Sequence, residues 1–373
     1  MKKTVGIYRL NFPEVSETFI RAQLGAYRSY RPTVYAKKAL AQSSWPINAV
    51  SAHGSWAERK FLLTRSPRWH RLAQDTPPQL LHAHFGVDGV YALPLAKGLG
   101  IPLVTTFHGF DVLTKRSWWL RHPSLPVAVY LAHLKELKSS GARFIAVSRF
   151  VEQALINAGF PLDRIVQHYI GVDTKKFQPN PGRRDPDSRY VLSVGRHVGF
   201  KGVDVLLKAF AQIVPRHPDV HLLQVGAGPL TPSLKALAQE LGLSARVTFL
   251  GAQPNERVVQ LLQGAEVFAL PSRTHSSGST EALGIVFNEA SACAVPIAST
   301  RSGGIPEVVL DGETGLLCGE GDDAALAVNL DAILSDKSLG ERFGRRGREL
   351  VCDSFDLQRQ TEKLEQIYDE VIA

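Results

Sequence analysis

The chain has 373 residues, of which 44% are hydrophobic and 21% are charged, and this composition excludes a disordered, collagen-like or disulfide-stapled protein. At roughly 100 to 200 residues per domain, the length predicts two domains, with one large barrel as the competing architecture. The three cysteines, Cys293, Cys318 and Cys352, lack metal-ligand spacing. They argue against a structural zinc site and indicate a reducing compartment.

The formal net charge of +8 is distributed unevenly. Residues 1–180 carry 24 Lys and Arg against 10 Asp and Glu, a net charge of +14, whereas residues 181–373 carry 19 against 25, a net charge of −6. No window approaches the roughly 20 apolar residues that cross a bilayer, and a secretory apolar region is absent from the start of the chain. We therefore expect a cytoplasmic protein, free or peripheral on the inner face of the cytoplasmic membrane.

Short apolar runs alternate with helical patterns along the whole chain. The predicted strands form two sets, 4–8, 80–85, 103–107 and 144–147, then 191–194, 221–225, 247–250, 267–270 and 295–298. Apolar residues at helical spacing lie between them, for example over 205–214 and 234–241. This alternation predicts an α/β protein built from right-handed βαβ units with parallel sheets.

A segment between residues 171 and 190 is rich in proline, glycine and charge, which is typical of a linker. We expect a first domain at 1–172, a linker at 173–189, a second domain at 190–355, and a C-terminal helix at 356–373 that packs back on the first domain. Ligands of open α/β sheets bind at the carboxyl ends of the strands. The chemistry is therefore expected in the loops that follow strands.

The stretch from Glu281 to Glu289 is the most informative one. Gly284 marks an expected helix start, because Ile285 and Val286 open a run of helical spacing. Such a start presents unpaired N–H groups that suit a phosphate, and carboxylates accept paired hydrogen bonds from the hydroxyls of a sugar or ribose. The plainer interpretation is that both glutamates are solvated helix charges.

Two cations follow the predicted strand 191–194. Arg196 and Lys201 lie on a loop that is punctuated by Gly195 and Gly202. A guanidinium and an ammonium at the carboxyl end of a strand supply the donors that hold a diphosphate. Either cation alone is typical of a solvated loop, but the two together predict a clamp.

Further motifs occur in a fixed order along the chain: Phe107-His108-Gly109-Phe110-Asp111, Ala146-Val147-Ser148, Gly171-Val172-Asp173, Val225-Gly226-Ala227-Gly228-Pro229, Gly303-Gly304-Ile305-Pro306-Glu307 and Gly312-Glu313-Thr314-Gly315. With Gly195-Arg196, Lys201-Gly202 and the spacing of Glu281 and Glu289, the chain resembles the family 4 retaining glycosyltransferases of the GT-B fold, in particular the exopolysaccharide and colanic-acid branch. The resemblance covers nearly the whole chain.

The resemblance implies two doubly wound Rossmann-like domains that face a central cleft. It implies catalytic roles for His108, Glu281, Arg196 and Lys201. It also implies a site for a nucleotide-sugar donor at Ser16, Gly195, Arg196, Lys201, Gly226, Gly228, Leu283, Gly284, Ile285, Val286 and Glu289. Neither a metal nor a cofactor is expected.

The family assigns each residue a role. Arg196 and Lys201 would stabilise the leaving diphosphate, Glu289 would bind the ribose hydroxyls, and Glu281 would hold the transferred sugar. His108 would contact the donor sugar and the reacting face. The expected reaction moves a hexose from a UDP- or GDP-sugar to a saccharide or to a polyprenyl-diphosphate-linked acceptor, in the synthesis of a bacterial-type surface polysaccharide.

Two other functions stay open, a nucleotide-sugar epimerase or phosphorylase of the same fold and a non-catalytic basic module that binds membranes. Nucleic acid is not expected as a partner, because the cations are scattered without an aromatic-interleaved basic array. The clearest departure from the family is the segment around Ser16, Glu17 and Thr18, which stands where many relatives have paired glycines. It is typical of a helix cap, and its amides and hydroxyls could equally serve the phosphate or the acceptor.

Two weaker patterns remain. His82 and His84 share one face of a predicted strand, but no carboxylate or thiolate at matching spacing supports a metal pair. Trp118 and Trp119 lie beside Lys115, Arg116 and Arg121, so this segment is either ordinary packing or a patch for an anionic membrane surface.

Overall fold

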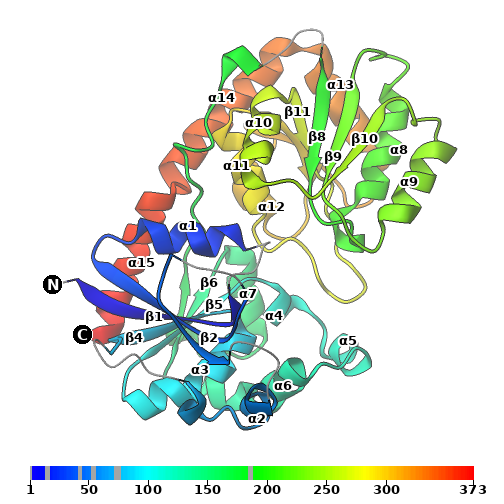
Figure 1. The fold of residues 1–373 in the computed structure, drawn as a ribbon. Helices are drawn as coiled ribbons and strands as arrows, with labels where there is room; N and C mark the ends of the chain where they lie inside the picture. Colours follow the sequence, from blue (N-terminus) through cyan, green and yellow to red (C-terminus); the bar gives the residue numbers. More distant parts are fainter. Residues whose placement is uncertain (1, 13–16, 41–43, 52–55, 71–76, 184–187) are drawn as a thin grey trace. The chain divides into compact units, whose positions relative to one another are not determined.

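The computed structural model describes residues 2–12, 17–40, 44–51, 56–70, 77–183 and 188–373 (Figure 1). They form two compact units. The first comprises Met1–Gly171 and Leu357–Ala373, and the second comprises Val172–Asp356. Within the described residues, no helix combines the length and the apolar character needed to cross a membrane.

The first unit is a parallel sheet of seven strands in the order β3-β2-β1-β4-β5-β6-β7. Its strands are β1 (Lys3–Phe12), β2 (Tyr30–Ala39), β3 (Ile47–Ser51), β4 (Leu80–His84), β5 (Leu103–Phe107), β6 (Arg143–Ala146) and β7 (Ile165–Gln167). Its helices are α1 (Thr18–Ala26), α2 (Trp56–Thr64), α3 (Gly86–Leu99), α4 (Phe110–Leu113), α5 (Arg116–Arg121), α6 (Leu125–Lys138), α7 (Arg149–Asn157) and α15 (Leu357–Ile372).

Helix α15 returns to the first unit and packs beside α1 (Figure 1). Its apolar stripe, which includes Leu364 and Tyr368, joins the core formed by β1, β2, β4, β5 and α1. The carboxylate of Glu365 accepts hydrogen bonds from the backbone N–H groups of Arg28, Ser29 and Tyr30, which tie the helix to the start of β2.

The second unit is a parallel sheet of six strands in the order β10-β9-β8-β11-β12-β13. Its strands are β8 (Tyr190–Val194), β9 (His221–Val225), β10 (Val247–Gly251), β11 (Val267–Ala269), β12 (Ile297–Thr300) and β13 (Gly315–Cys318). Its helices are α8 (Val203–Ile213), α9 (Thr231–Glu240), α10 (Asn255–Gly264), α11 (Ile285–Ala292), α12 (Ile305–Val308), α13 (Asp323–Ser335) and α14 (Lys337–Ser354).

Both sheets are wholly parallel, as the alternation of apolar runs and helices predicts. Strand order reverses beside the first strand of each unit, β1 and β8, which is the arrangement of a doubly wound sheet. The predicted α/β class with two Rossmann-like halves is therefore confirmed. Four further strands, β2, β3, β7 and β13, are not among those predicted from the sequence.

The segment that joins the units is anchored to the second one. Val172 forms a parallel bridge with Asp356, and its N–H donates to the carbonyl of Phe355 at 2.8 Å. The guanidinium of Arg348 donates to the carbonyls of Phe177 and Thr174. The two places where the chain passes from one unit to the other therefore lie side by side.

Candidate functional site

The carboxyl edge of the second sheet holds most of the predicted site residues, and glycines bring its loops into close contact. Gly195 follows β8, and its N–H donates to the carbonyl of Val225 at the end of β9. Gly226 has a φ of +130°, and a Cβ there would lie 1.9 Å from the carbonyl oxygen of Gly195. A Cβ on Gly228 would lie 2.5 Å from the carbonyl oxygen of His197. Larger residues would therefore force these two loops apart.

Lys201 ends a short 3-10 turn, Gly199–Lys201, that leads into α8. Its Nζ lies 2.5 Å from Oε2 of Glu281, and both side chains are nearly buried. The same Oε2 accepts a hydrogen bond of 3.3 Å from the hydroxyl of Ser272. The structure thus brings together the predicted cation and the predicted carboxylate, from loops 80 residues apart.

The backbone of Glu281 is held by the loop after β12. The N–H of Gly304 donates to the carbonyl of Glu281 at 2.9 Å. Gly303 has a φ of +54°, and a Cβ there would lie 2.0 Å from that same carbonyl oxygen. The hydroxyls of Thr280 and Ser302 are 2.7 Å apart. The Gly303-Gly304 motif is therefore required for this position of Glu281.

Helix α11 begins where the sequence predicts it. Gly284 stands at its N-cap with a φ of +85°, where a side chain would be strained, and Leu283 before it is buried. Ile285 and Val286 form the first turn and are half-buried. The unpaired N–H groups of such a turn, with the positive end of the helix dipole, are suited to an anion.

Glu289 lies on α11, one to two turns inside the helix, and is half-buried. Burial raises the pKa of its carboxyl to about 7, and the ammonium of Lys176 opposes this shift. Within the described residues its carboxylate has no hydrogen-bond partner. A carboxylate with two free acceptor oxygens and a raised pKa is ready for a ligand that donates hydrogen bonds.

Arg196 is exposed, and its guanidinium has no ion pair in the described part of the chain. It therefore does not share the pairing that holds Lys201. Chemically, this edge combines one free guanidinium, one ammonium, two carboxylates and a helix start. Such a set can hold a ligand with an anionic part and a polyhydroxyl part.

The carboxyl edge of the first sheet holds His108. Its Nε2 lies 3.1 Å from Nδ1 of His84, and the ring packs against Phe19 and Phe85. Burial lowers the pKa of both histidines well below the usual value, and the guanidinium of Arg9 lowers them further. His108 is therefore neutral at physiological pH.

Ser16 lies outside the described residues, but its neighbour Glu17 has a clear role. The carboxylate of Glu17 accepts two hydrogen bonds from Arg9, at 3.0 Å from Nε and 2.5 Å from Nη2. Arg9 also donates to Asp88 and to the carbonyl of His84. Arg9 therefore joins the ends of β1 and β4 to the start of α1.

The sequence predicts no role for Arg9 or Ser272, and no contact between the two histidines. Arg9 lies within a strand, and neither Arg9 nor Ser272 belongs to a recognisable motif. The alternative of a metal pair at His82 is not supported, because its nitrogens contact the hydroxyls of Tyr368 and Thr106. The described residues contain no group of three or more His, Cys, Asp or Glu side chains suited to a metal ion.

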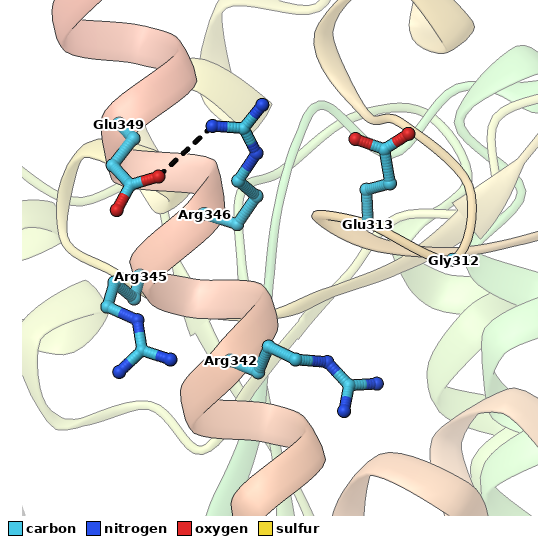
Figure 2. Close-up of a pocket in the computed structure, with 6 residues that line it drawn as sticks. All are labelled: Gly312, Glu313, Arg342, Arg345, Arg346 and Glu349. Atoms are coloured by element: carbon cyan, nitrogen blue, oxygen red, sulfur yellow. Dashed lines mark hydrogen bonds and ion pairs between the residues drawn. The ribbon is translucent and has the colours of Figure 1, made fainter.

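A hollow of about 310 Å³ in the second unit lies away from these residues. Figure 2 shows it between α14, with Arg342, Arg345 and the ion pair of Arg346 with Glu349, and the turn at Glu313. That turn precedes β13, so the hollow is at the amino edge of the parallel sheet. Its lining carries three arginines and two glutamates, so most of the positive charge is offset.

The structure separates the two tryptophans, for which the sequence left packing and a surface patch open. Trp119 is buried against Phe110 and Tyr130, so for this residue the structure favours ordinary packing over a surface patch. Trp118 is half-buried and stacks on His122. The exposed apolar side chain of α5 is Leu120.

The solved structures that this chain resembles share its fold. The chain matches Anabaena HepE, solved in complex with UDP-glucose, with a TM-score of 0.78 at 21% identity, covering 99% of this chain and all of that one. It matches the sucrose-phosphate synthase of Thermosynechococcus elongatus with a TM-score of 0.79 at 21% identity, covering 99% of both chains. The fold is the GT-B fold of glycosyltransferases.

Sequence comparison identifies the family. The model "Glycosyl transferases group 1" matches residues 174–350, and the model "Glycosyltransferase Family 4" matches residues 26–176. A GDP-mannose-dependent alpha-(1-6)-phosphatidylinositol monomannoside mannosyltransferase of Mycolicibacterium smegmatis is 30% identical over 94% of both chains. The putative colanic acid biosynthesis glycosyltransferase WcaL of Escherichia coli is 31% identical over 95% of this chain and 96% of its own. The chain belongs to glycosyltransferase family 4, as the motifs predict.

Proposed function

We propose that this glycosyltransferase moves a hexose from a UDP- or GDP-sugar to a saccharide or a lipid-linked saccharide, with retention at the anomeric carbon and without a metal. The product would be part of a bacterial-type surface polysaccharide. The relatives support a nucleotide-sugar donor, since one is named as GDP-mannose-dependent and HepE was solved with UDP-glucose. The relative WcaL is named for colanic acid biosynthesis.

The observation that carries the proposal is the ion pair of Lys201 with Glu281, with Glu289 on the helix that follows. Lys201 and Arg196 would bind the diphosphate, and Glu281 the hydroxyls of the transferred sugar. Glu289 would bind the ribose, and the backbone at Leu283 and Gly284 would add donors at the helix start. The loops of Gly226 and Gly228 would line the base.

The bond that breaks joins the anomeric carbon to the diphosphate oxygen, and the bond that forms joins that carbon to the acceptor oxygen. Negative charge grows on the leaving diphosphate, so cations aimed at it stabilise the transition state more than the ground state. The acceptor's proton would pass to the departing phosphate oxygen. In this scheme the two glutamates bind hydroxyls, and attack occurs on the face from which the diphosphate leaves.

The first unit would supply the acceptor side. Its net positive charge suits a diphosphate-linked or anionic acceptor. On α5 and beside it, the cations Lys115, Arg116 and Arg121 and the apolar Leu120 are exposed. We name these four residues the α5 patch, and infer that it binds an anionic membrane surface.

The test is product analysis with the whole protein, UDP-glucose or GDP-mannose, and saccharide acceptors, with and without a metal chelator. We expect a new glycosidic linkage with the α configuration of the donor, formed equally well with chelator. A β linkage would contradict retention, and loss of activity with chelator would contradict metal independence. An isomerised nucleotide sugar without transfer would identify an epimerase instead.

A further inference from the structure

His84 and His108 meet through one ring nitrogen each. Nδ1 of His84 and Nε2 of His108 are 3.1 Å apart, and the two rings are stacked at 26° with centroids 5.4 Å apart. Each residue is held in place by its neighbours. Arg9 donates to the backbone carbonyl of His84, and the ring of His108 contacts Phe19 and Phe85.

Each of the two imidazoles carries a single proton. Burial, Arg9 and the neighbouring histidines lower the pKa of both rings, so neither is charged at neutral pH. A neutral imidazole has one N–H and one unprotonated nitrogen. One ring must therefore donate the shared hydrogen bond and the other must accept it.

The other nitrogen of His84 indicates the direction. Nε2 of His84 is buried and has no hydrogen-bond partner among the described residues. A proton on that atom would be a buried donor without an acceptor, which is rare in folded proteins and costly. The proton of His84 is therefore placed on Nδ1, where it is donated to Nε2 of His108.

We propose that His84 is a positioning residue that fixes His108 as the tautomer with its proton on Nδ1. His108 then presents a hydrogen-bond donor to a ligand oxygen and does not act as a base. Its Nδ1 has no partner within the described part of the chain, so it is the ring nitrogen left for a ligand. The inference deepens the proposed function, on which the role of His108 in sugar transfer rests.

The two histidines of β4 have different hydrogen-bond partners. His82 shares the strand face with His84, but its nitrogens contact the hydroxyls of Tyr368 and Thr106. Hydroxyls donate or accept as required, so they impose no tautomer on His82. Both histidines lower the pKa of His108 or share its surroundings, but only His84 is hydrogen-bonded to it, so the tautomer of His108 is set by His84.

The direct test is a long-range ¹H–¹⁵N correlation spectrum of the whole protein with labelled histidine, which reports which ring nitrogen is protonated. The signals of His108 are assigned by their loss in H108Q. We expect His108 to be neutral at pH 7.5 with its proton on Nδ1. A proton on Nε2 of His108 would overturn the proposal. This spectrum is recorded without substrate, so it tests the tautomer independently of the proposed function. If the proposed function were wrong, sugar transfer would be absent while the spectrum still showed the proton on Nδ1.

Three variants complete the test. Asparagine at position 84 places an amide where Nδ1 lies, so H84N should keep the spectrum of His108 and most of the activity. H84L removes the donor, and we expect altered His108 signals and a loss of about tenfold in kcat, the equivalent of one hydrogen bond. H82N is the matched control, since it disturbs the same strand and should leave the His108 signals unchanged. Identical His108 signals in H84L and the wild type would also overturn the proposal.

Discussion

The ammonium of Lys201 and the carboxylate of Glu281 are held 2.5 Å apart at the carboxyl edge of the second sheet. Both side chains are nearly buried, so the pair is screened less by water than a surface ion pair. A diphosphate would draw Lys201 toward its own charge, and sugar hydroxyls would replace the ammonium as donors to Glu281. The pair thus keeps two groups of opposite charge ready for the two ends of one ligand.

The loop of Gly303 offers a test of how Glu281 is positioned. A Cβ on Gly303 would lie 2.0 Å from the carbonyl oxygen of Glu281, so G303A must displace the backbone at that residue. We expect at least a tenfold loss of transfer activity and a lower melting temperature by circular dichroism. Gly312 is the matched control, because it also has positive φ but faces open space. G312A should lower the free energy of unfolding only by the backbone strain, about 1 kcal/mol, and should keep the transfer activity. Equal losses of activity in the two variants would contradict the role of Gly303 in positioning Glu281.

Glu289 predicts a pH dependence of donor binding. Burial raises the pKa of its carboxyl to about 7, and only the ionised form offers all its lone pairs to ribose hydroxyls. The affinity for a nucleotide sugar, whose phosphodiesters do not titrate in this range, should fall as the pH drops from 8 to 6. In E289Q the affinity should be weaker and flat over the same range. Calorimetric titration measures both, and a wild-type affinity independent of pH would contradict the role of Glu289.

His168 predicts acid sensitivity of the first unit. Burial lowers its pKa to about 4, while its Nε2 lies 2.8 Å from the carbonyl oxygen of Gln360 on α15. The unfolded chain binds this proton near pH 6.5, so stability should fall as the pH drops from 6.5 toward 4. A glutamine keeps a donor at the position of Nε2 without titrating. H168Q should therefore lose less stability than the wild type between pH 7.5 and 5, by on the order of 1 to 2 kcal/mol.

Urea unfolding followed by tryptophan fluorescence measures the free energy of unfolding of the first unit, which contains His168. All five tryptophans lie between residues 45 and 119, so the signal reports on the first unit alone. Parallel stability curves for H168Q and the wild type would refute the assignment.

The α5 patch predicts charge-dependent membrane binding. Replacing Lys115, Arg116 and Arg121 with glutamine should weaken the binding of anionic liposomes in a co-sedimentation assay by on the order of 100-fold, since each cation contributes about 1 kcal/mol near such a surface. Donor binding should be unchanged. The control removes the same charge from α14, at Lys337, Arg342 and Arg345, which are exposed in the second unit. Equal loss in both triple variants would show a nonspecific effect of net charge.

Apolar runs predict the central strands well, because strands buried on both faces consist mostly of apolar residues. Strand β2 escapes this signal, since it contains Pro32, Lys37 and Lys38. It forms because pairing with β1 buries Val34 and Tyr35 in the sheet. The pairing with β1 therefore outweighs the weak strand preference of this segment. No pattern within the segment itself indicates that pairing.

Some residues of the candidate site can be predicted from the sequence, and others are seen only in the folded chain. Lys201, Glu281 and Glu289 lie in motifs whose chemistry can be inferred from their spacing, and the structure brings Lys201 and Glu281 together. The role of Arg9 depends on side chains 8 and 79 residues away. Spacing of that kind carries no local signal, so only the folded chain reveals it.

The claim that the carboxyl edge of the second sheet binds a nucleotide sugar is tested most directly by calorimetric titration of UDP-glucose and GDP-mannose into the wild type, K201M and K208M. Lys208 is exposed on α8, outside the proposed site. We predict that the wild type and K208M bind one of these donors equally, whereas K201M loses at least about tenfold in affinity and about 100-fold in turnover, with an unchanged circular dichroism spectrum. Wild-type affinity and turnover in K201M, or a wild type that binds neither donor, would contradict it.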